Sequence, residues 1–297
     1  MTFLTIFTAP KPFTNPHINT IQRNAIQSWM HLSDDVDVIL VGKEDGLSEI
    51  ADEYDLKHLP GVARNNWNTP LVSSIFDLAR AASDSPVMAY INADILLLPE
   101  FVKIAHLVAD QVEKFLIVGQ RWDYDSSDAI EFAPNWDQSL RTDIQERGVL
   151  HAPAGSDYFI FPRSVFTNIP DFAIGRAGWD NWMIYHVLQN RWPVVDATKS
   201  LNVVHQNHDY SHLPQGKIHY DLEETKINAQ LGGGMRNMYM TLDASHELIN
   251  DRVRKVRPSF LRVLRKLERW LHPQLQKGPR WEMTRTIRRL RRNITKG

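Results

Sequence analysis

The sequence predicts an α/β fold: a mainly parallel central sheet flanked by helices, followed by a C-terminal helical extension. Three observations support this prediction. Over the first 120 positions, short apolar stretches alternate with amphipathic stretches, which is typical of parallel sheets. The composition, 43% hydrophobic and 23% charged, is that of a globular protein. Residues 251–297, in contrast, combine strong basic charge with a helical spacing of apolar residues.

The elements of the first 120 residues follow from local signals. Continuous apolar or β-branched runs predict strands at 2–8, 36–41, 86–91 and 115–119. Apolar residues that return every three or four positions predict helices at 17–32, 47–54, 69–82 and 99–112. Thr69 is expected to cap the third of these helices, with Pro70 in its first turn.

The pattern loosens after residue 120, where tryptophans lie in a polar region interrupted by Pro and Gly. We predict strands at 158–162 and 201–205 and a helix at 179–188. No repeat and no linker precede residue 250. Residues 1–250 are therefore interpreted as one domain with two halves, about 1–120 and 121–250, and residues 251–297 as a separate helical tail.

The charge is unevenly distributed along the 297 residues. Residues 1–250 hold 18 basic and 32 acidic residues, a net charge of −14, whereas residues 251–297 hold 16 basic and 3 acidic ones, a net charge of +13. The chain has no cysteine, which excludes disulfides, thiolate metal sites and cysteine nucleophiles. Neither a signal peptide nor a membrane-spanning helix is expected, so the sequence predicts a cytoplasmic protein.

The sharpest motif is Tyr-Ile-Asn-Ala-Asp-Ile at 90–95, where an apolar strand runs into a short acidic turn. In open α/β sheets ligands bind beyond the carboxyl ends of the strands, and a carboxylate there can hold Mg²⁺ or Mn²⁺. Asn92 and Asp94 are two residues apart, so on an extended segment they point to the same side and could face one ion together. The alternative is an ordinary turn built from Asn and Asp.

Two further segments carry carboxylates beside aromatic rings. Asp157 and Tyr158 lie in Gly-Ser-Asp-Tyr-Phe at 155–159, and Asp180 lies in Gly-Trp-Asp-Asn-Trp at 178–182. Asp180 either caps a helix or provides a carboxylate at an acceptor pocket whose walls are Trp179 and Trp182. Aromatic faces next to carboxylates suit sugar rings, since C–H faces stack on the rings while hydroxyls bond to the acid.

A fourth segment, 204–212, holds three histidines and an aspartate after a predicted strand. His205 and His208 are candidate metal ligands beside Asp94. The alternative is a polar loop of hydrogen-bonded histidines. The spacing is not that of a zinc site, and neither a phosphate-binding loop nor a dinucleotide-binding glycine motif is present in the sequence.

Taken together, these segments resemble GT-A-type nucleotide-sugar glycosyltransferases, over roughly residues 2–240. The resemblance lies in the order and spacing of INADI, SDYF, GWDNWM and HQNHDYSH. It implies a GT-A-like fold with a donor half at about 1–120 and an acceptor half at about 121–250. It also implies a UDP- or GDP-sugar donor, with Mn²⁺ or Mg²⁺ on the diphosphate. Asn92 departs from the family pattern, which has Asp at this first position of the D-x-D turn.

The resemblance also implies roles for single residues. Asp94 would bind the metal, together with His205 and His208. Asp180, or as second choice Asp157, would be the base that activates the acceptor. By analogy of fold, Thr8, Ala9, Pro10, Arg64, Asn92 and Asp94 are expected at the donor. The acceptor, a glycan or a lipid-linked or small molecule, is expected to contact Trp122, Tyr158, Trp179 and Trp182.

Two other functions are compatible with the same sequence. A catalytically inactive sugar-binding protein or scaffold is one, because Asn92 removes a charge from the metal site. A nucleotidyltransferase is disfavoured, because 8–11 offers one lysine and no glycine where that class needs a glycine-rich basic loop.

The tail contains two basic amphipathic segments, 259–272 and 279–294, separated by a Pro-rich break. We expect them to lie on an anionic membrane surface, at its inner face, or to dock on the acidic body or on a second subunit with the apolar stripe buried. A nucleic acid is not expected as partner, since no nucleic-acid motif is present in the sequence.

Overall fold

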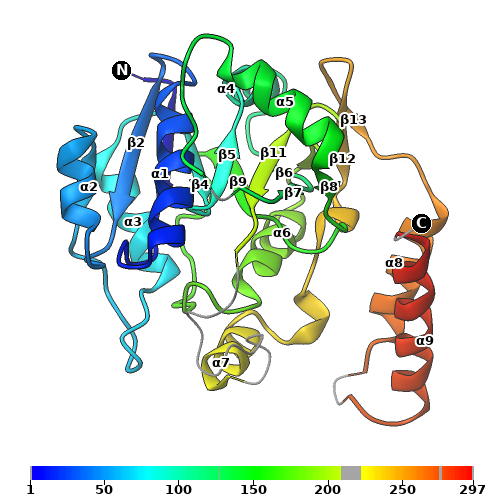
Figure 1. Ribbon diagram of the computed structural model, residues 1–297. Helices are drawn as coiled ribbons and strands as arrows, with labels where there is room; N and C mark the ends of the chain where they lie inside the picture. The colour runs from blue at the N-terminus through cyan, green and yellow to red at the C-terminus, as the bar shows by residue number, and fades with distance from the viewer. Residues whose placement is uncertain (1, 127, 209–221, 274–275, 296–297) are drawn as a thin grey trace.

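The computed structural model describes residues 2–126, 128–208, 222–273 and 276–295. Within these residues nine strands form the main sheet, in the order β13-β12-β10-β6-β9-β4-β1-β2-β3. The strands are β1 (Leu4–Thr8), β2 (Val36–Val41), β3 (Lys57–Leu59), β4 (Val87–Ile91), β6 (Leu116–Val118), β9 (Tyr158–Pro162), β10 (Val194–Asp196), β12 (His246–Ile249) and β13 (Arg252–Lys255). All are parallel except β9, inside the sheet, and β13, at its edge. The mainly parallel α/β fold predicted from the sequence is confirmed (Figure 1).

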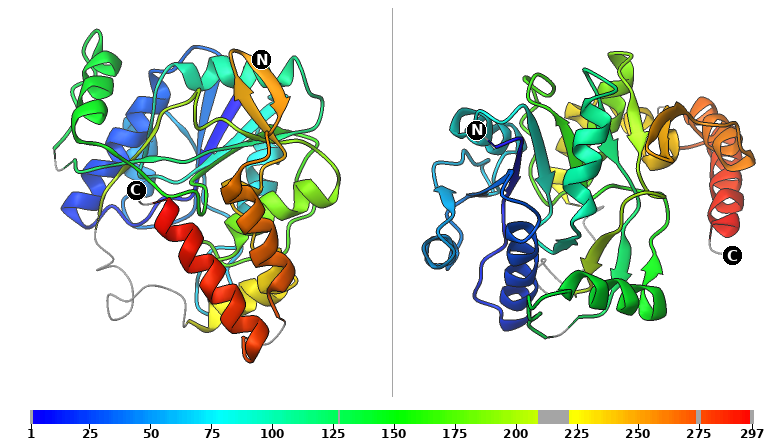
Figure 2. Two further views of the ribbon diagram at one scale, coloured as in Figure 1. Left: turned by 90° about the vertical axis from the view of Figure 1, so that its right-hand side faces the viewer. Right: turned by 90° about the horizontal axis from the view of Figure 1, so that it is seen from above.

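Helices cover both faces of this sheet (Figures 1 and 2). One core contains side chains from α1 (Pro16–Met30), α2 (Leu47–Glu53) and α4 (Glu100–Ala109), and the other contains side chains from α3 (Val72–Ala82) and α6 (Trp179–Gln189). Alternate residues of a strand enter opposite cores, as Ala89 and Tyr90 of β4 do. Burial of both faces explains why central strands such as β4 and β9 are almost continuously apolar in sequence.

A second, smaller sheet lies beside the first and has the order β5-β11-β7-β8. Its strands are β5 (Ile95–Leu97), β11 (Val203–Gln206), β7 (Trp122–Tyr124) and β8 (Val149–Leu150), and α5 (Trp136–Arg147) packs on it. The apolar run after Asp94 is therefore a strand of this second sheet and not a continuation of β4. The chain passes from one sheet to the other at 92–94.

The start of α3 differs from the prediction. The helix begins at Val72 with Leu71 as N-cap, so neither Thr69 nor Pro70 has the expected role. Pro70 and Leu71 instead form bridges with Arg64 and Ala173. These tertiary contacts keep the two residues extended, and the helix starts one residue after them.

The last strand and the tail are joined directly. β13 pairs with β12, so the chain leaves the main sheet after Lys255. α7 (Glu223–Leu231) and two 3-10 turns, Met235–Asn237 and Thr241–Asp243, precede this edge. The two tail helices, α8 (Phe260–Leu271) and α9 (Pro279–Ile294), lie side by side as a hairpin, here called the C-terminal hairpin (Figures 1 and 2). Across the described ranges, no helix has the length and apolar character needed to span a bilayer.

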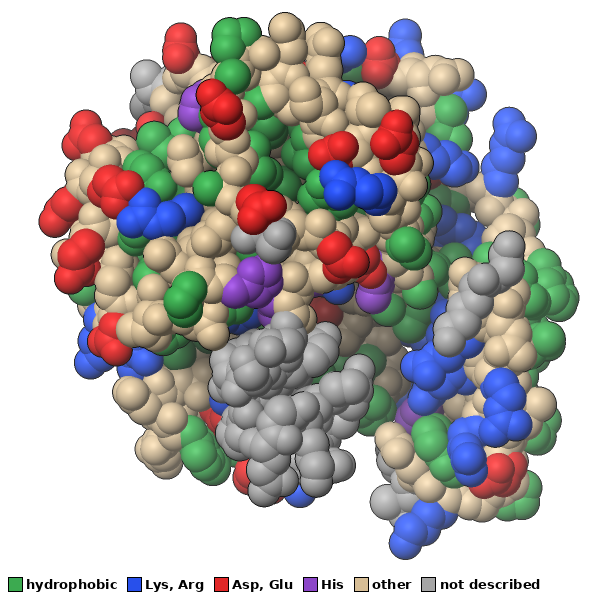
Figure 3. Space-filling view, viewed as in Figure 1, with side chains coloured by type: hydrophobic (Ala, Val, Ile, Leu, Met, Phe, Trp, Pro, Cys, Tyr) green, Lys and Arg blue, Asp and Glu red, His purple; other side chains and the backbone are tan. Residues whose placement is uncertain are grey.

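The C-terminal hairpin docks on the body through its polar side. Arg265 and Arg269 each approach the Asp243 carboxylate to 2.9 Å, while Phe260 and Trp270 on the other side are 63% and 71% exposed. The expectation that docking on the body buries the apolar stripe is therefore wrong. Ion pairs with the acidic body make this contact, and most of the stripe remains exposed. Figure 3 shows basic and apolar side chains together on the hairpin, beside a body that carries most of the acidic ones.

Candidate functional site

The candidate site lies where the chain passes from the main sheet to the small one. Asn92, Ala93 and Asp94 form a turn between β4 and β5, closed by the Ile95 amide, which donates to the Asn92 carbonyl at 3.1 Å. The Asp94 carbonyl accepts from the backbone amide of Gln206, at the end of β11, at 3.1 Å. This backbone bond fixes the turn beside the histidine segment. The carboxyl end of β4 therefore carries a buried acid, where open α/β sheets bind ligands.

Asp94, His205 and His208 form a group that could hold a metal ion. Their ligand atoms all lie within 4.8 Å of one another. The Asp94 Oδ2 atom is 3.0 Å from His208 Nε2 and 4.0 Å from His205 Nε2. The expected juxtaposition of Asp94 with both histidines is thus present in the structure. Residues more than a hundred positions apart in sequence meet because β5 and β11 pair antiparallel.

This group fits Mn²⁺ or Mg²⁺ in its donor atoms. A carboxylate and imidazoles are donors that Mn²⁺ accepts, and Mg²⁺ takes carboxylate oxygens with water or phosphate completing its shell. Among the described residues, Asp94 Oδ1 is buried and has no hydrogen-bond partner. A buried carboxylate oxygen without a partner is costly in a folded protein, and a bound cation would satisfy it.

Lys11 adds a positive charge to the same group, and sequence reasoning did not assign it a role there. Its Nζ atom lies 3.1 Å from His208 Nε2 and 3.7 Å from Asp94 Oδ2. Burial alone would raise the pKa of Asp94, but the His208 hydrogen bond and the charges of His205 and Lys11 lower it well below its usual value. Asp94 is therefore ionised at all physiological pH values and is ready to bind a cation.

Asn92 does not share the environment of Asp94. Its side-chain amide donates to Asp157 Oδ1 at 2.9 Å, and its backbone amide donates to the Asp157 carbonyl at 2.9 Å. The expectation that Asn92 and Asp94 face one ion together is not met, because the turn directs the two side chains to different partners. Asparagine at position 92 thus has a structural reason: an aspartate there would oppose Asp157.

Asp157 is fully engaged by its neighbours. Its Oδ1 atom accepts from Asn92, and its Oδ2 atom is 2.7 Å from Arg121 Nη1. Arg121 also contacts Asp123 at 2.9 Å, and Asp123 Oδ1 lies 3.5 Å from His205 Nδ1. This chain of charges links Asp157 to the histidine of the metal-ligand group. Both oxygens of Asp157 are thus already engaged, one by Asn92 and one by Arg121, which disfavours Asp157 as base.

Asp123 and His151 belong to the same network and were missed at the sequence level. His151 Nδ1 is 2.6 Å from Asp123 Oδ2. Burial opposes ionisation of Asp123, but hydrogen bonds from His205 and His151 lower its pKa below the usual range. The only sequence signal was the Trp-Asp-Tyr run of β7, which is too short for its periodicity to be recognised.

Asp180 occupies the first turn of α6. The N-cap of this helix is Gly178, so Asp180 is not the cap. Burial, reinforced by the negative charge of Asp157, raises the pKa of Asp180 to about 6, although backbone amides partly oppose the shift. A carboxylate with a pKa near neutrality is suited to general-base work.

Gly155 leaves the space that Asp180 occupies. A Cβ atom at position 155 would lie 2.5 Å from Asp180 Oδ2, closer than unbonded atoms approach. The Gly-Ser-Asp segment before β9 thus contributes in two ways: Gly155 gives Asp180 room, and Asp157 sets the local charge.

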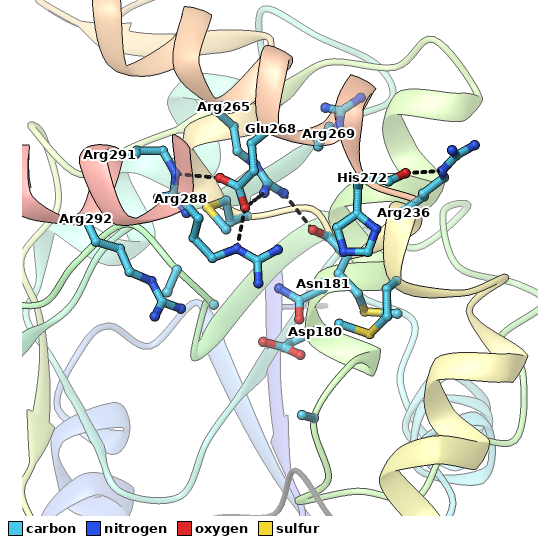
Figure 4. A pocket seen from close by; sticks show the side chains of 16 residues that line it. Asp180, Asn181, Arg236, Arg265, Glu268, Arg269, His272, Arg288, Arg291 and Arg292 are labelled. Atoms are coloured by element: carbon cyan, nitrogen blue, oxygen red, sulfur yellow. Dashed lines mark hydrogen bonds and ion pairs between the residues drawn. The ribbon is translucent and has the colours of Figure 1, made fainter. Parts of the chain in front are cut away.

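Asp180 faces a pocket of about 450 Å³ between the body and the C-terminal hairpin. Figure 4 shows Asp180 and Asn181 on one wall, with Arg288 and Arg292 extending from α9 into the same space. Sequence reasoning did not predict that the basic tail would form part of this site. Nothing in the linear sequence connects α9 with α6.

The aromatic residues expected at the acceptor are placed differently. Tyr158, Trp179 and Trp182 are buried, and both tryptophans belong to the core between α3, α6 and the main sheet. Trp179 packs edge-on against Tyr90, with ring centroids 5.1 Å apart. Trp122 packs on the small core of the second sheet. The three buried rings therefore stabilise the fold and do not form the open aromatic wall that we expected.

The expected donor residues lie at the carboxyl ends of β1 and β2. Thr8 ends β1, and its hydroxyl is buried with no hydrogen-bond partner among the described residues. Ala9 and Pro10 follow it. Arg64 pairs with Glu44, just after β2, at 2.6 Å. Thr8 and Arg64 are thus near the edge where parallel sheets bind nucleotides, and their contact with a donor remains a prediction.

No protein-family model and no curated protein matches the chain. Among solved structures, it is similar to S. aureus TarS 1–349 in complex with UDP-GlcNAc, at 11% identity and a TM-score of 0.48, over 78% of this chain and 70% of that chain. With another structure of TarS 1–349 the identity is 12% and the TM-score 0.47. This match covers 69% of this chain and 60% of that chain.

The chain is also similar to glucosyl-3-phosphoglycerate synthase from Mycobacterium tuberculosis in complex with Mn²⁺, UDP-glucose and phosphoglyceric acid. Here the identity is 16% and the TM-score 0.49, over 78% of this chain and 80% of that chain. These are similarities of fold at low sequence identity. No residue role is carried over from them.

Proposed function

We propose that the protein is a glycosyltransferase that moves a sugar from a nucleotide-sugar donor, with a UDP-sugar as first choice, to an acceptor hydroxyl. The observation that carries this proposal is the convergence of Asp94, His205 and His208 at the carboxyl end of β4. Parallel α/β sheets bind nucleotides at this edge, and a cation there would meet the diphosphate.

Asp94, His205 and His208 would hold Mn²⁺ or Mg²⁺. When bound, the ion neutralises the negative charge that develops on the leaving diphosphate. Lys11, next to Asp94, adds a second positive charge for the same diphosphate. Thr8 ends β1, Ala9 and Pro10 follow it, and Arg64 pairs with Glu44 just after β2. These four residues are proposed to contact the nucleotide. The unpaired hydroxyl of Thr8 offers a hydrogen bond there.

Asp180 is proposed as the general base. It would accept the proton of the acceptor hydroxyl as that oxygen attacks the anomeric carbon. Its raised pKa supports this role, and its place on the wall of an open pocket gives an acceptor access to it. Asp157 is less suitable, because Asn92 and Arg121 already occupy both of its oxygens. A base on the acceptor side is the arrangement used for direct displacement with inversion.

The experiment measures UDP release from a panel of UDP-sugars with Mn²⁺, for the wild type, Asp94→Ala and Asp180→Asn. We expect turnover to fall in both variants, while UDP binding is weakened only in Asp94→Ala. Equal turnover in the wild type and Asp94→Ala would overturn the metal assignment. Sugar-nucleotide binding without UDP release from any acceptor would favour the alternative function, an inactive sugar-binding protein.

We also propose that the protein lies peripherally on the inner, cytoplasmic face of a membrane, through the apolar face of the C-terminal hairpin. This face consists of exposed apolar residues at helical spacing: Phe260, Val263, Leu267, Trp270, Met283, Leu290 and Ile294. Basic residues of the same helices surround it, and anionic lipids would neutralise them. This match of apolar area with positive charge favours a membrane over a second copy of the chain, which carries the same positive hairpin.

Co-sedimentation with vesicles that contain phosphatidylglycerol tests the membrane proposal. We expect binding by the wild type, loss of binding by Phe260→Ser/Trp270→Ser, and weak binding to neutral vesicles. If the protein ignores anionic vesicles but dimerises through these two residues, the apolar face is a subunit interface instead.

A further inference from the structure

The C-terminal hairpin is held by an acid that lies almost entirely inside it. Glu268 of α8 is 1% exposed and accepts from Arg288 Nε at 2.8 Å and Arg291 Nε at 2.9 Å, both on α9. Arg265, one turn earlier on α8, lies 3.3 Å from the same carboxylate. This network fixes the angle between the two helices. It also fixes the place where α9 presents its arginines to the body.

The pocket between α9 and Asp180 carries far more positive than negative charge. Of the residues that the structure describes, two carboxylates line it, Asp180 and Glu268. The same lining holds six arginines: Arg236, Arg265, Arg269, Arg288, Arg291 and Arg292. Asp243, behind the wall, pairs with Arg265 and Arg269. Even after these pairings the wall retains an excess of positive charge. Like charges brought this close repel one another unless an anion is placed between them.

The unused hydrogen-bond donors of this wall point into the cavity. Arg292 makes no ion pair within the described part of the chain, and Arg288 uses only its Nε atom on Glu268. In Figure 4 both guanidinium groups extend from α9 toward the wall where Asp180 and Asn181 lie. Guanidinium groups bind phosphate oxygens with paired hydrogen bonds, and two of them can hold one phosphate group.

We propose that this pocket binds the acceptor, and that the acceptor carries a phosphate group held by Arg288 and Arg292 while its hydroxyl meets Asp180. The inference rests on the proposed transferase function and names the chemical class of its acceptor. A volume of about 450 Å³ accommodates a sugar phosphate or a phosphorylated polyol. The phosphate belongs either to a soluble small molecule or to the headgroup of a lipid-linked acceptor, and the pocket chemistry is the same for both.

The arrangement also explains why the basic tail is part of the protein. Without the hairpin, Asp180 would face solvent and the body would offer an acidic surface to the acceptor. With the hairpin docked, one wall supplies the base and the other supplies the anion site. The body therefore contacts the hydroxyl of the acceptor, and the C-terminal hairpin contacts its phosphate.

Calorimetric titration of the full-length protein with inorganic pyrophosphate tests the pocket directly, without catalysis. Metal is left out, so that the probe does not bind through a cation. We expect Arg292→Gln to weaken binding about tenfold, and Arg288→Gln/Arg292→Gln further, because charge-assisted hydrogen bonds are lost. Higher salt should weaken binding in the wild type as well.

The matched control is Arg285→Gln/Arg289→Gln. It removes the same charge from the same helix, but neither residue lines the pocket. Wild-type affinity in this control supports the proposal. A loss in the control equal to that in Arg288→Gln/Arg292→Gln would show a diffuse basic surface and overturn it. Thermal unfolding of each variant checks that the hairpin remains folded, and Arg292→Gln is the decisive variant because it breaks no ion pair.

Two further ligands separate the sources of the phosphate. A hexose phosphate represents a soluble acceptor, and an isoprenyl phosphate in micelles represents a lipid-linked one. If the wild type binds either ligand and Arg292→Gln does not, the result supports the proposed pocket. If the wild type binds neither ligand, the proposal is overturned. UDP binding with Mn²⁺, measured in the same variants, reports on the donor site separately. If pyrophosphate binds through Arg292 but UDP does not bind, the proposed transferase function fails while the anion site stands.

Discussion

Asn92 donates both its side-chain amide and its backbone amide to Asp157, each at 2.9 Å. This pair joins the turn after β4 to the start of β9, its antiparallel neighbour in the main sheet. It holds Asp157 at the centre of the charge network that runs through Arg121 to His205. The side-chain amide of Asn92 therefore serves as a hydrogen-bond donor to Asp157 and not as a metal ligand.

Replacing Asn92 with Asp should destabilise the protein at neutral pH. The substitution creates an Asp-x-Asp turn at 92–94, but it places a second carboxylate against Asp157 and removes its donor. We expect the free energy of unfolding at pH 7 to fall by about 1–3 kcal/mol, the usual cost of an unsatisfied buried polar contact. The loss should shrink toward pH 4, where one of the two carboxylates binds a proton.

Denaturant unfolding at the two pH values measures this effect, with Asn66→Asp, at an exposed position, as the control. The same variants titrated with Mn²⁺ offer a second readout. Tighter Mn²⁺ binding in Asn92→Asp would mean that position 92 faces the ion after all.

Mn²⁺ binding should depend on Asp94 more than on any surface acid. Asp94 provides the charged ligand of the group, so Asp94→Ala should weaken Mn²⁺ binding at least tenfold. Loss of a residue that only supports a metal ligand already weakens metal binding by about this factor. Electron paramagnetic resonance of free Mn²⁺ gives the affinity without any substrate. Asp84→Asn, an exposed acid before β4, should bind as the wild type does. Equal affinity in Asp94→Ala and Asp84→Asn would remove the metal site from these residues.

The strong periodic segments of the sequence predicted the sheet well. The β1, β2, β4 and β9 strands were predicted because buried strands of five or six residues are rich in apolar and β-branched residues. The three-residue β7 and β10 escaped prediction because each includes an aspartate and lies beside polar residues, whereas the equally short β6 lies in the apolar run 115–118. The start of α3 was misplaced because bridges to Arg64 and Ala173 override the capping signal of Thr69.

The site was partly predictable for a similar reason. Asp94 was recognisable because it follows an apolar strand, and His205 because it lies near the end of one. The ends of strands gather at one edge. Trp179 and Trp182 were expected beside the acceptor, but sequence does not show which side of α6 faces the sheet. Lys11, Asp123 and the arginines of α9 depend on contacts between distant segments. No local pattern encodes such contacts.

Glu268 should be the residue on which the docked hairpin most depends. Its Gln variant keeps the shape but removes the charge that holds Arg265, Arg288 and Arg291 together. Breaking a buried ionic network of this kind costs about 3–5 kcal/mol. We expect proteolytic cleavage within 256–295 to be faster in Glu268→Gln than in the wild type. In Glu282→Gln the cleavage rate should equal that of the wild type, because the exposed pair of Glu282 with Arg285 contributes little.

The stability due to Glu268 also has a definite pH dependence. Burial would raise its pKa, but the surrounding arginines lower it below the usual value. A depressed carboxyl pKa contributes stability above the unfolded-state value, and this contribution is lost as the pH falls through the folded-state value. Wild-type hairpin docking, followed by amide hydrogen exchange in α8 and α9, should therefore weaken only below about pH 4.5. Docking that weakens already near pH 6 would point to a different group.

Asp180 should impose its own pH dependence on catalysis, with a midpoint at higher pH than that of hairpin docking. Its pKa is raised to about 6, so the basic form is lost as the pH falls through this value. We expect kcat/KM to drop about tenfold per pH unit below 6, and Asp180→Asn to lose about 10²-fold or more at pH 7.5. Because the folded state favours protonated Asp180, the ionised acid destabilises the wild type above pH 6. Asp180→Asn should therefore be more stable there, on the order of 1 kcal/mol.

Gly155→Ala tests the role of Asp180 by moving its carboxylate, whereas Asp180→Asn removes the charge. The added Cβ lies 2.5 Å from Asp180 Oδ2, so the carboxylate must move away from its place on the pocket wall. We expect kcat to fall while the affinity for Mn²⁺ is unchanged, since Asp94 and its histidines lie on other elements. Gly61→Ala, whose Cβ would meet no atom within 4 Å, should leave both quantities as in the wild type. If Gly155→Ala retains full kcat, the position of Asp180 does not limit the reaction, and the base must be sought elsewhere.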